Sequence, residues 1–224
     1  AKVFGQLEAS GLLAAGMPGG ACFPSVIRDG RALTETHGER SWIGASIQDL
    51  LGQRLGRPIT VINDADAAGV AEVAYGAGMG QRGVVLLLDL GTGIGTALFV
   101  NGELVPNLQL GHLELHGRDA ETRVSPVARL QRKISWKTWA GEFNELLARY
   151  QDYLWPHQII LGGGTAKDFP KFEQYLKTRA PLVVAGLGTA AGIIGAARVA
   201  ANAATAAPGA PAGSRRPGRP ARRA

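Results

Sequence analysis

The feature that most constrains the fold is a buried-strand pattern that runs directly into a glycine-rich turn, LLLDLGTGIG. Leu86 to Leu90 reads as a strand with the acidic residue Asp89 near its end, and Gly91, Thr92 and Gly93 follow. Because glycines have no Cβ, the backbone N–H groups of such a turn can approach phosphate oxygens closely, and the Thr92 hydroxyl adds a donor. A carboxylate at the strand end can hold a metal ion or its waters. A turn of this composition is suited to a phosphate site.

The same residues also fit a plain β-hairpin. Residues 96 to 100 continue as a second strand, and Asn101-Gly102 is the dipeptide favoured in tight hairpin turns. The local sequence favours neither interpretation. The balance shifts toward a site because polar side chains follow the hairpin, where a polar substrate could bind; they are Gln109, His112, Glu114 and Glu121.

A second candidate site lies where a predicted strand meets a predicted helix. Residues 59 to 62 are rich in β-branched side chains, residues 65 to 75 favour a helix, and Asn63 and Asp64 lie between them. A carboxylate at this junction can accept the proton of a substrate hydroxyl. The alternative, which is commoner, is that Asp64 or Asp66 caps the helix.

The other elements alternate between helix and strand. An amphipathic helix is expected over 46–55, and the clearest helix over 136–154, where apolar residues recur every three or four positions and indicate core packing. Further strands are predicted over 158–161 and 181–185. A glycine turn and helix begin at residue 162, and a small-residue helix covers 189–204. This order predicts an α/β fold.

The composition limits which disulfides and membrane segments the chain can have. The single cysteine, Cys22, excludes an internal disulfide and is expected to be a small buried thiol. No apolar run approaches the roughly 20 residues of a membrane span, and we expect a cytoplasmic protein.

The net charge of +6 is unevenly distributed. Five arginines lie in the Ala/Pro/Arg-rich segment 205–224, which we expect to be disordered, and the rest of the chain is nearly neutral. Residues 118 to 137 contain six basic and two acidic residues. A solvated face is the favoured interpretation; the alternative is a row of cations that attracts a polyanion.

Several spaced motifs resemble the sugar kinases of the ROK family, and within it the polyphosphate glucokinase branch. In order they are RSWIG (40–44), VINDADAAGVAEVAYGAG (61–78), LGTGIGTALFVNGELVPN (90–107) with LGHLEL (110–115), LGGGTAKDF (161–169) and TAAGIIGAA (189–197). Their agreement in order and spacing makes the resemblance specific.

The resemblance implies the actin-like ATPase fold, in which two ribonuclease-H-like lobes flank a cleft. The Asp-x-Gly-Gly-Thr loop with which such kinases open is not found in this sequence, so the first lobe is expected to be incomplete. The implied division is a remnant of the N-terminal lobe (1–62), a C-terminal lobe with the sugar and donor motifs (63–204), and the tail (205–224).

The resemblance also assigns roles to residues. Asp64 becomes the catalytic base and Asp66 the helix cap. The implied sugar ligands are Asn63, Gln109, His112 and Glu121, with Glu114 a less favoured substitute for Glu121. Gln109 stands where the family has glutamate, which implies weaker or altered sugar binding. The implied phosphate-donor residues are Asp89, Gly91, Thr92, Gly93, Gly162, Gly163 and Gly164.

The implied activity is phosphorylation of glucose at its 6-hydroxyl by inorganic polyphosphate, or by ATP, with Mg²⁺. Zinc is not expected, because the cysteine-rich loop of many relatives is missing, and no residue is assigned as a metal ligand. A homodimer is expected, without membrane or specific nucleic-acid partners. The alternative, favoured by Gln109 and the missing loop, is a non-catalytic protein that binds sugar or a partner.

Overall fold

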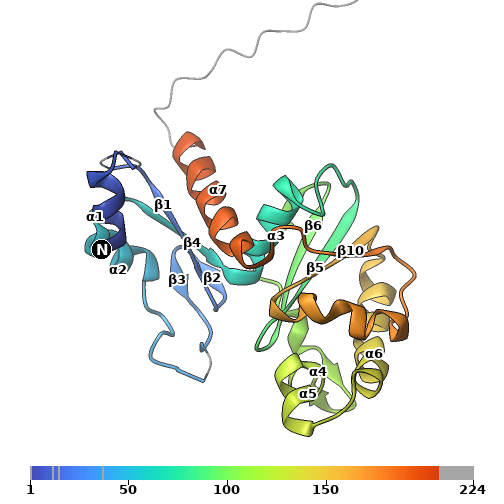
Figure 1. The fold of residues 1–224 in the computed structure, drawn as a ribbon. Coiled ribbons are helices and arrows are strands. Elements are labelled where there is room, and N and C mark those ends of the chain that lie inside the picture. The colour runs from blue at the N-terminus through green and yellow to red at the C-terminus, as the bar shows by residue number, and fades with distance from the viewer. Residues whose placement is uncertain (1, 12, 15, 37, 207–224) are drawn as a thin grey trace, which may run out of the picture.

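The computed structural model describes residues 2–11, 13–14, 16–36 and 38–206, and it has the expected α/β architecture. Figure 1 shows two lobes, one blue and built from the N-terminal elements, the other green to orange and built on a larger sheet. Helices α3 (Asp64–Tyr75) and α7 (Ala191–Ala206) lie between them. The expected disordered tail is wrong at residues 205 and 206, which are the last residues of α7, and the rest of it, from residue 207 onward, lies outside the described residues.

The first lobe is built on two parallel strands, β1 (Gly19–Phe23) and β4 (Ile59–Asn63), which pair along their whole length. A short hairpin and two helices accompany them: β2 (Ile27–Arg28), β3 (Arg31–Ala32), α1 (Lys2–Ala9) and α2 (Ile47–Leu55). The core of this lobe consists of Ile27, Ala32, Ile47, Ile59 and Val61.

The predicted helix at 46–55 is confirmed, and its ends have clear local causes. The Ser46 hydroxyl accepts a hydrogen bond from the Asp49 amide at 3.2 Å, which satisfies one of the free N–H groups of the first turn. Gly56 ends the helix in the left-handed conformation (φ 63°), which glycine adopts without steric cost.

The second lobe contains a mixed five-stranded sheet in the order β11–β10–β5–β6–β7. Its strands are β5 (Val84–Leu90), β6 (Ile94–Val100), β7 (Glu103–Val105), β10 (Gln158–Gly162) and β11 (Leu182–Val184). β5, β6 and β7 are antiparallel, whereas β10 runs parallel to β5 and β11. Gly162 pairs with Asp89, so the two glycine turns leave the sheet side by side at the same end.

The hairpin interpretation is therefore correct for the backbone of the glycine-rich stretch. The turn at residues 91–93 joins β5 to β6, and Asn101 and Gly102 turn β6 into β7 with φ angles of 53° and 86°. Positive φ at both positions is what a two-residue hairpin turn requires. A hairpin does not exclude a phosphate site at its tip.

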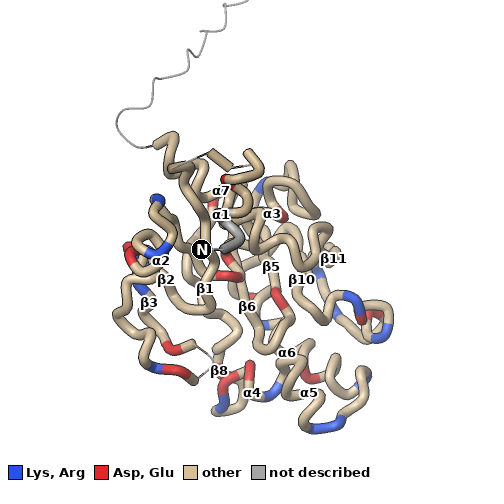
Figure 2. The backbone as a smooth tube through the Cα atoms, turned by 60° about the vertical axis from the view of Figure 1, so that its left-hand side comes forward, with Lys and Arg blue, Asp and Glu red and all other residues tan. Residues whose placement is uncertain are grey.

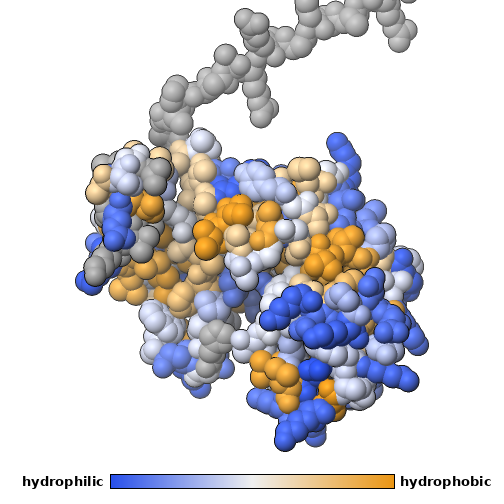
Figure 3. Space-filling view, viewed as in Figure 1, coloured by the Kyte–Doolittle hydropathy of each residue, from blue (hydrophilic) through white to orange (hydrophobic). Residues whose placement is uncertain are grey.

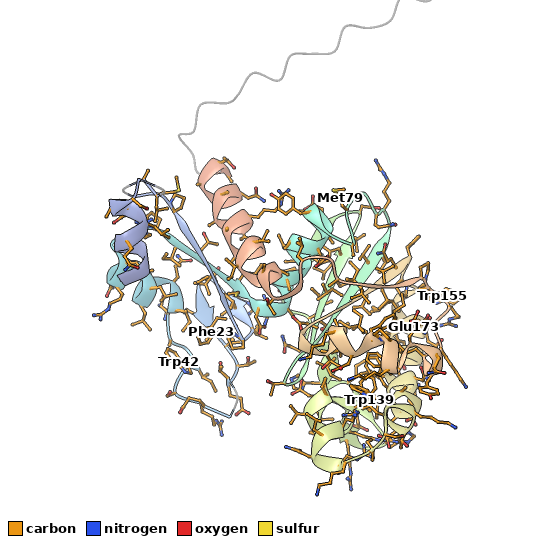
Figure 4. All side chains as sticks on the ribbon, viewed as in Figure 1. Phe23, Trp42, Met79, Trp139, Trp155 and Glu173 are labelled. Carbon is orange, nitrogen blue, oxygen red and sulfur yellow. The ribbon has the colours of Figure 1, made fainter. Side chains whose placement is uncertain are left out.

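Helix α6 (Trp136–Leu154) confirms the predicted helix and covers the second lobe's core. Trp139 is fully buried and stacks on Phe143 with 4.8 Å between ring centroids. Figure 4 shows Trp139 inside this lobe, far from Phe23 and Trp42 of the first lobe. The aromatic face is thus a packing surface, as predicted.

Short elements complete the second lobe. They are η1 (Leu110–His112), β8 (Glu114–Leu115), β9 (Arg118–Asp119), α4 (Ala120–Val124), α5 (Pro126–Arg132), η2 (Gly164–Lys171), η3 (Glu173–Tyr175) and η4 (Gly188–Ala190). The helix expected after the second glycine turn is the 3₁₀ helix η2. Pro170 lies inside it and has no N–H to give to an α-helical ladder.

Helices α3 (Asp64–Tyr75) and α7 (Ala191–Ala206) pack closely against each other, and α7 also packs on β1. A Cβ on Gly195 would overlap the Ala67 carbonyl, and one on Gly20 would overlap the Ala196 carbonyl. The expected close packing of this small-residue helix is confirmed. Because α7 contacts the first lobe, the division at residue 62 stays a prediction.

Candidate active site

A cavity of about 250 Å³ lies where α3, α7 and the ends of β1, β5 and β10 meet. Carboxylates and glycines form much of its wall. Its lining residues are Cys22, Asp64, Ala68, Glu72, Leu87, Asp89, Gly162, Gly163, Gly164, Ala185, Gly188, Thr189, Ala191 and Gly192. The structure thus brings the predicted base, the predicted donor carboxylate and the second glycine turn to one place.

Asp64 is the first residue of α3, and its carboxylate is exposed. Asn63 fixes this position, because its side-chain oxygen caps the helix by accepting from the Asp66 amide at 3.1 Å. The assignment of capping to Asp66 is therefore wrong: Asp66 supplies the capped N–H. The buried Asn63 amide also donates to the Ser25 carbonyl at 3.1 Å, and its role as a sugar ligand stays a prediction.

Asp89 lies next to the last residue of β5, and no described residue forms a hydrogen bond with its carboxylate. Burial raises the pKa of Asp89 to about 6, and the nearby Asp64 carboxylate adds to the shift. Gly163 adopts φ 81°, and a Cβ there would overlap the Asp89 carboxylate. Only glycine therefore allows the second turn to pass this close to Asp89.

The donor set fits a magnesium ion that enters with a phosphate. Among the described residues, no group of three His, Cys, Asp or Glu side chains could hold a metal by itself. Mg²⁺ is commonly bound by one or two carboxylates together with substrate phosphates and waters. Asp89, without a hydrogen-bond partner and facing the cavity, has the character of such a ligand.

The predicted sugar ligands lie on the segment that follows β7. Both residues are exposed: Gln109 directly precedes η1 and His112 is its last residue. Two side chains anchor η1. The Thr96 hydroxyl accepts from the Leu110 amide at 3.1 Å, and the Tyr150 hydroxyl donates to the Leu110 carbonyl at 2.9 Å.

Glu121 connects this segment to the first glycine turn. Its carboxylate accepts a hydrogen bond from the Ile94 amide at 2.8 Å, and a Cβ on Gly93 would overlap it. A Cβ on Gly95 would lie 2.8 Å from the Ala65 Cβ, so the start of β6 is also in contact with the start of α3. The turn therefore joins the segment 109–121, which carries the predicted sugar ligands and is called the sugar segment below, to the helix that carries Asp64.

Some predicted site residues lie outside the cavity wall. Gly91, Thr92 and Gly93 do not line it, nor do the predicted sugar ligands. Gly93 instead admits Glu121, as described above. Glu114 lies on β8 and is exposed. The roles assigned to all of these residues stay predictions.

Cys22 differs from expectation. Its side chain is exposed and lines the cavity, so the prediction of a buried thiol is wrong. The reason is the position of β1, whose Cys22 faces the cavity beside Gly192 and not the core of the first lobe. Partial desolvation and the Asp64 carboxylate raise the pKa of the Cys22 thiol.

Two acidic residues near the site were not singled out from the sequence. Glu72 is fully buried and accepts hydrogen bonds from the backbone amides of Ala77, Gly186 and Leu187, which fixes the loop after β11 against α3. Asp119 accepts from the Glu121 amide at 2.8 Å and contacts His112. Asp119 directly precedes α4, and an aspartate immediately before a helix is a sequence signal for a helix cap.

Two of the six basic residues in the segment 118–137 form ion pairs with acids. Arg123 and Arg132 both contact Glu142, and the Arg129 guanidinium lies 3.6 Å from the centroid of the Trp136 ring. Figure 2 shows basic and acidic positions interspersed around α4 and α5. This pairing favours the solvated-face interpretation over a row of free cations.

The two lobes, with the cavity between α3, α7 and the sheet, have a sugar kinase fold of the actin-like ATPase type. The chain belongs to the ROK family, whose model matches residues 13–124. No helix in the described part of the chain is long and apolar enough to cross a membrane.

Within the family, the chain is similar to polyphosphate glucokinases. It is 40% identical over 181 residues to the polyphosphate glucokinase of Mycobacterium tuberculosis (strain CDC 1551 / Oshkosh), an alignment that covers 80% of this chain and 68% of that protein. The solved inorganic polyphosphate/ATP-glucomannokinase from Arthrobacter sp. strain KM superposes with a TM-score of 0.86 at 43% identity, covering 90% of this chain and 80% of that one. The ROK hexokinase from Thermus thermophilus (TM-score 0.68, 23% identity, 91% and 85% coverage) shares the fold.

Proposed function

We propose that this chain transfers the terminal phosphoryl group of inorganic polyphosphate, or of ATP, to the 6-hydroxyl of glucose. The observation that carries the proposal is the common cavity of Asp64, Asp89 and the turn of Gly162 to Gly164. The names of the two relatives with about 40% identity support the substrates.

Asp64 is the general base of the proposed reaction. A sugar hydroxyl is a weak nucleophile, and an exposed carboxylate at the cavity wall can orient it and accept its proton. Asp66 cannot take this role, because it is 1% exposed and one of its oxygens accepts from the Asn107 amide.

The atoms balance in a single transfer. The 6-oxygen of glucose forms a bond to the terminal phosphorus as its proton passes to Asp64, and the bond from that phosphorus to the bridging oxygen breaks. The bridging oxygen keeps the electron pair, which leaves shortened polyphosphate or ADP. The products are glucose 6-phosphate and the shortened donor, and the proton is later released to water.

The donor would lie against Gly162 to Gly164 and Asp89. Glycine turns let backbone N–H groups face phosphate oxygens, and φ 81° at Gly163 gives this turn a shape that other residues rarely adopt. A magnesium ion held by Asp89 and the donor would neutralise charge on the transferred phosphate.

The test is steady-state formation of glucose 6-phosphate by the Asp64→Asn protein. Asparagine keeps the size and a hydrogen-bonding oxygen but cannot accept the proton, so we expect kcat to fall by about 10²- to 10⁴-fold. The glucose dissociation constant, measured by calorimetry, should change by less than about twofold.

The matched control is Asp29→Asn on the exposed β2–β3 turn, where φ is 50° and asparagine is tolerated. It makes the same chemical change away from the cavity and should leave kcat unaltered. An Asp64→Asn protein with the original kcat would refute the assignment. A folded original chain that binds glucose without turnover would instead support the binding-only alternative.

A further inference from the structure

We propose that Asp119 is a positioning residue that fixes the hydrogen-bonding direction of His112 toward the sugar; this inference rests on the proposed function. His112 Nδ1 lies 2.7 Å from Asp119 Oδ2. The other carboxylate oxygen, Oδ1, accepts from the Glu121 amide at 2.8 Å. One side chain thus contacts both the predicted imidazole ligand and the backbone amide of Glu121, the residue that carries the predicted carboxylate ligand.

Local structure keeps Asp119 in place. It lies on β9 directly opposite Glu114 of β8, in a two-residue hairpin whose turn residues His116 and Gly117 have φ angles of 53° and 75°. It also caps α4, and the Thr122 hydroxyl donates to its carbonyl at 2.7 Å. The hairpin and the cap together set the position of the carboxylate on two sides.

The consequence for His112 follows from the hydrogen-bond donors and acceptors of the imidazole ring. A carboxylate can only accept, so Nδ1 must carry the hydrogen of this contact. The neutral ring then has Nε2 as an acceptor, and no described residue forms a hydrogen bond with Nε2. Nε2 is therefore free to accept a hydrogen bond from a sugar hydroxyl, in the orientation that Asp119 imposes.

The arrangement continues from Asp119 into the first glycine turn. Glu121, whose amide is held by Asp119, accepts from the Ile94 amide, and Ile94 follows Gly93. The sugar segment and the turn that follows Asp89 are thus joined through consecutive hydrogen bonds. A substitution at Asp119 is therefore expected to change the affinity for the sugar more than the affinity for the phosphate donor.

The informative substitution is Asp119→Asn, which keeps the shape. Its amide oxygen can still accept from the Glu121 amide, and asparagine is as good a helix cap as aspartate. Its NH₂ group, however, donates to Nδ1, which forces the hydrogen of neutral His112 onto Nε2 and reverses the direction of the hydrogen bond offered to the sugar.

The first readout needs no turnover. In the ¹⁵N-labelled original chain, the imidazole ¹⁵N shifts of His112 should report a hydrogen on Nδ1, and adding glucose should move the Nε2 signal. In the Asp119→Asn protein the hydrogen should be on Nε2. Unchanged tautomers, or an Nε2 signal that glucose does not move, would overturn the inference.

The second readout is kinetic. Losing one correctly oriented hydrogen bond should raise the KM for glucose about tenfold while kcat at saturating glucose changes less than about twofold. In a His112→Gln background, Asp119→Asn should raise the KM by less than twofold more, because Asp119 acts through His112. Fully additive effects would show a merely structural role and overturn the inference.

The control is the second histidine–carboxylate pair of this region, His116 Nε2 and Glu145 Oε2, also 2.7 Å apart. Glu145→Gln makes the equivalent change away from the predicted sugar ligands and should leave both readouts unaltered. If the original chain makes no glucose 6-phosphate, the proposed function fails, and the NMR measurement still decides the role of Asp119.

Discussion

At the scale of single residues, Asp66 lies in an environment that is unfavourable for a charged carboxylate. Its side chain is 1% exposed; Oδ2 accepts from the Asn107 amide at 2.8 Å, while Oδ1 has no partner among the described residues. Burial is the main cause that raises the pKa of Asp66 to about 6, and the Asp64 carboxylate adds to it. The Asp66 carboxyl therefore holds its proton to a higher pH in the folded chain than in the unfolded chain.

This shift predicts a loss of stability as the pH rises. Between about pH 4 and pH 6 the unfolded chain has released the Asp66 proton and the folded chain has not, so the free energy of unfolding decreases with pH, by at most about 3 kcal/mol from this group. Asp66→Asn should remove that contribution and flatten the curve, as measured by urea unfolding at a series of pH values. Parallel curves for the two proteins would contradict the assignment.

The sequence predicted the positions of such residues better than their roles. The strand-to-helix pattern located Asn63, Asp64 and Asp66 correctly. It could not decide which of them caps α3, because that depends on the hydrogen bonds that the folded chain makes to Ser25 and Asn107. The exposure of Cys22 was also predicted wrongly, because it depends on which side of β1 faces the core, and this is set by the tertiary fold.

At the scale of elements, the contact between α3 and α7 places the cavity wall. Ala191 and Gly192 of α7 line the cavity together with Asp64 and Ala68 of α3. The two helices approach closely because Gly195 lies against the Ala67 carbonyl. The site thus depends on small residues that carry no chemistry of their own.

The same substitution should have opposite effects in two helices. In α7, a Cβ at Gly195 would overlap backbone, so Gly195→Ala should destabilise the protein by about 1–3 kcal/mol. In α6, a Cβ at exposed Gly141 would meet nothing within 4 Å, so Gly141→Ala should stabilise it by about 0.5–1 kcal/mol. Thermal unfolding of both proteins tests this, and a destabilised Gly141→Ala protein would be evidence against it.

Element prediction succeeded where periodicity was strong and failed where backbone detail decided. Helix α6 was predicted with its exact bounds, because its apolar face repeats over five turns. The helix after Gly164 was predicted without its type, since the 3₁₀ geometry follows from Pro170 and the close turn at Gly163. The hairpin at residues 91–93 and the phosphate site were stated as alternatives. The two are compatible, because the hairpin describes the backbone conformation and the phosphate site describes what that backbone binds.

At the scale of the whole molecule, side-chain contacts tie the first lobe to the site. The Asn107 side chain pairs with both the amide and the carbonyl of Ile27 on β2, each at 2.8 Å, while its own amide reaches Asp66 on α3. Three segments far apart in the sequence therefore meet beside the proposed base. Such contacts follow from the tertiary fold and have no local sequence signal.

The surface leaves the expected homodimer as a prediction. Figure 3 shows apolar side chains in several separate groups on this face, among hydrophilic ones. Some large apolar residues are well exposed, including Leu130 (65%) and Ile193 (73%). Separate groups of this kind are normal for a protein surface and do not by themselves indicate an interface.

Phosphoryl transfer to glucose can be followed directly by a ³¹P NMR time course of this chain with glucose, Mg²⁺ and either polyphosphate or ATP. We expect a glucose 6-phosphate signal to grow at the expense of the terminal phosphate of the donor, and not to grow with the Asp64→Asn protein. The relative rates would identify the preferred donor. A folded chain that yields no phosphomonoester signal with either donor, or an equal signal from the Asp64→Asn protein, would contradict the proposed function.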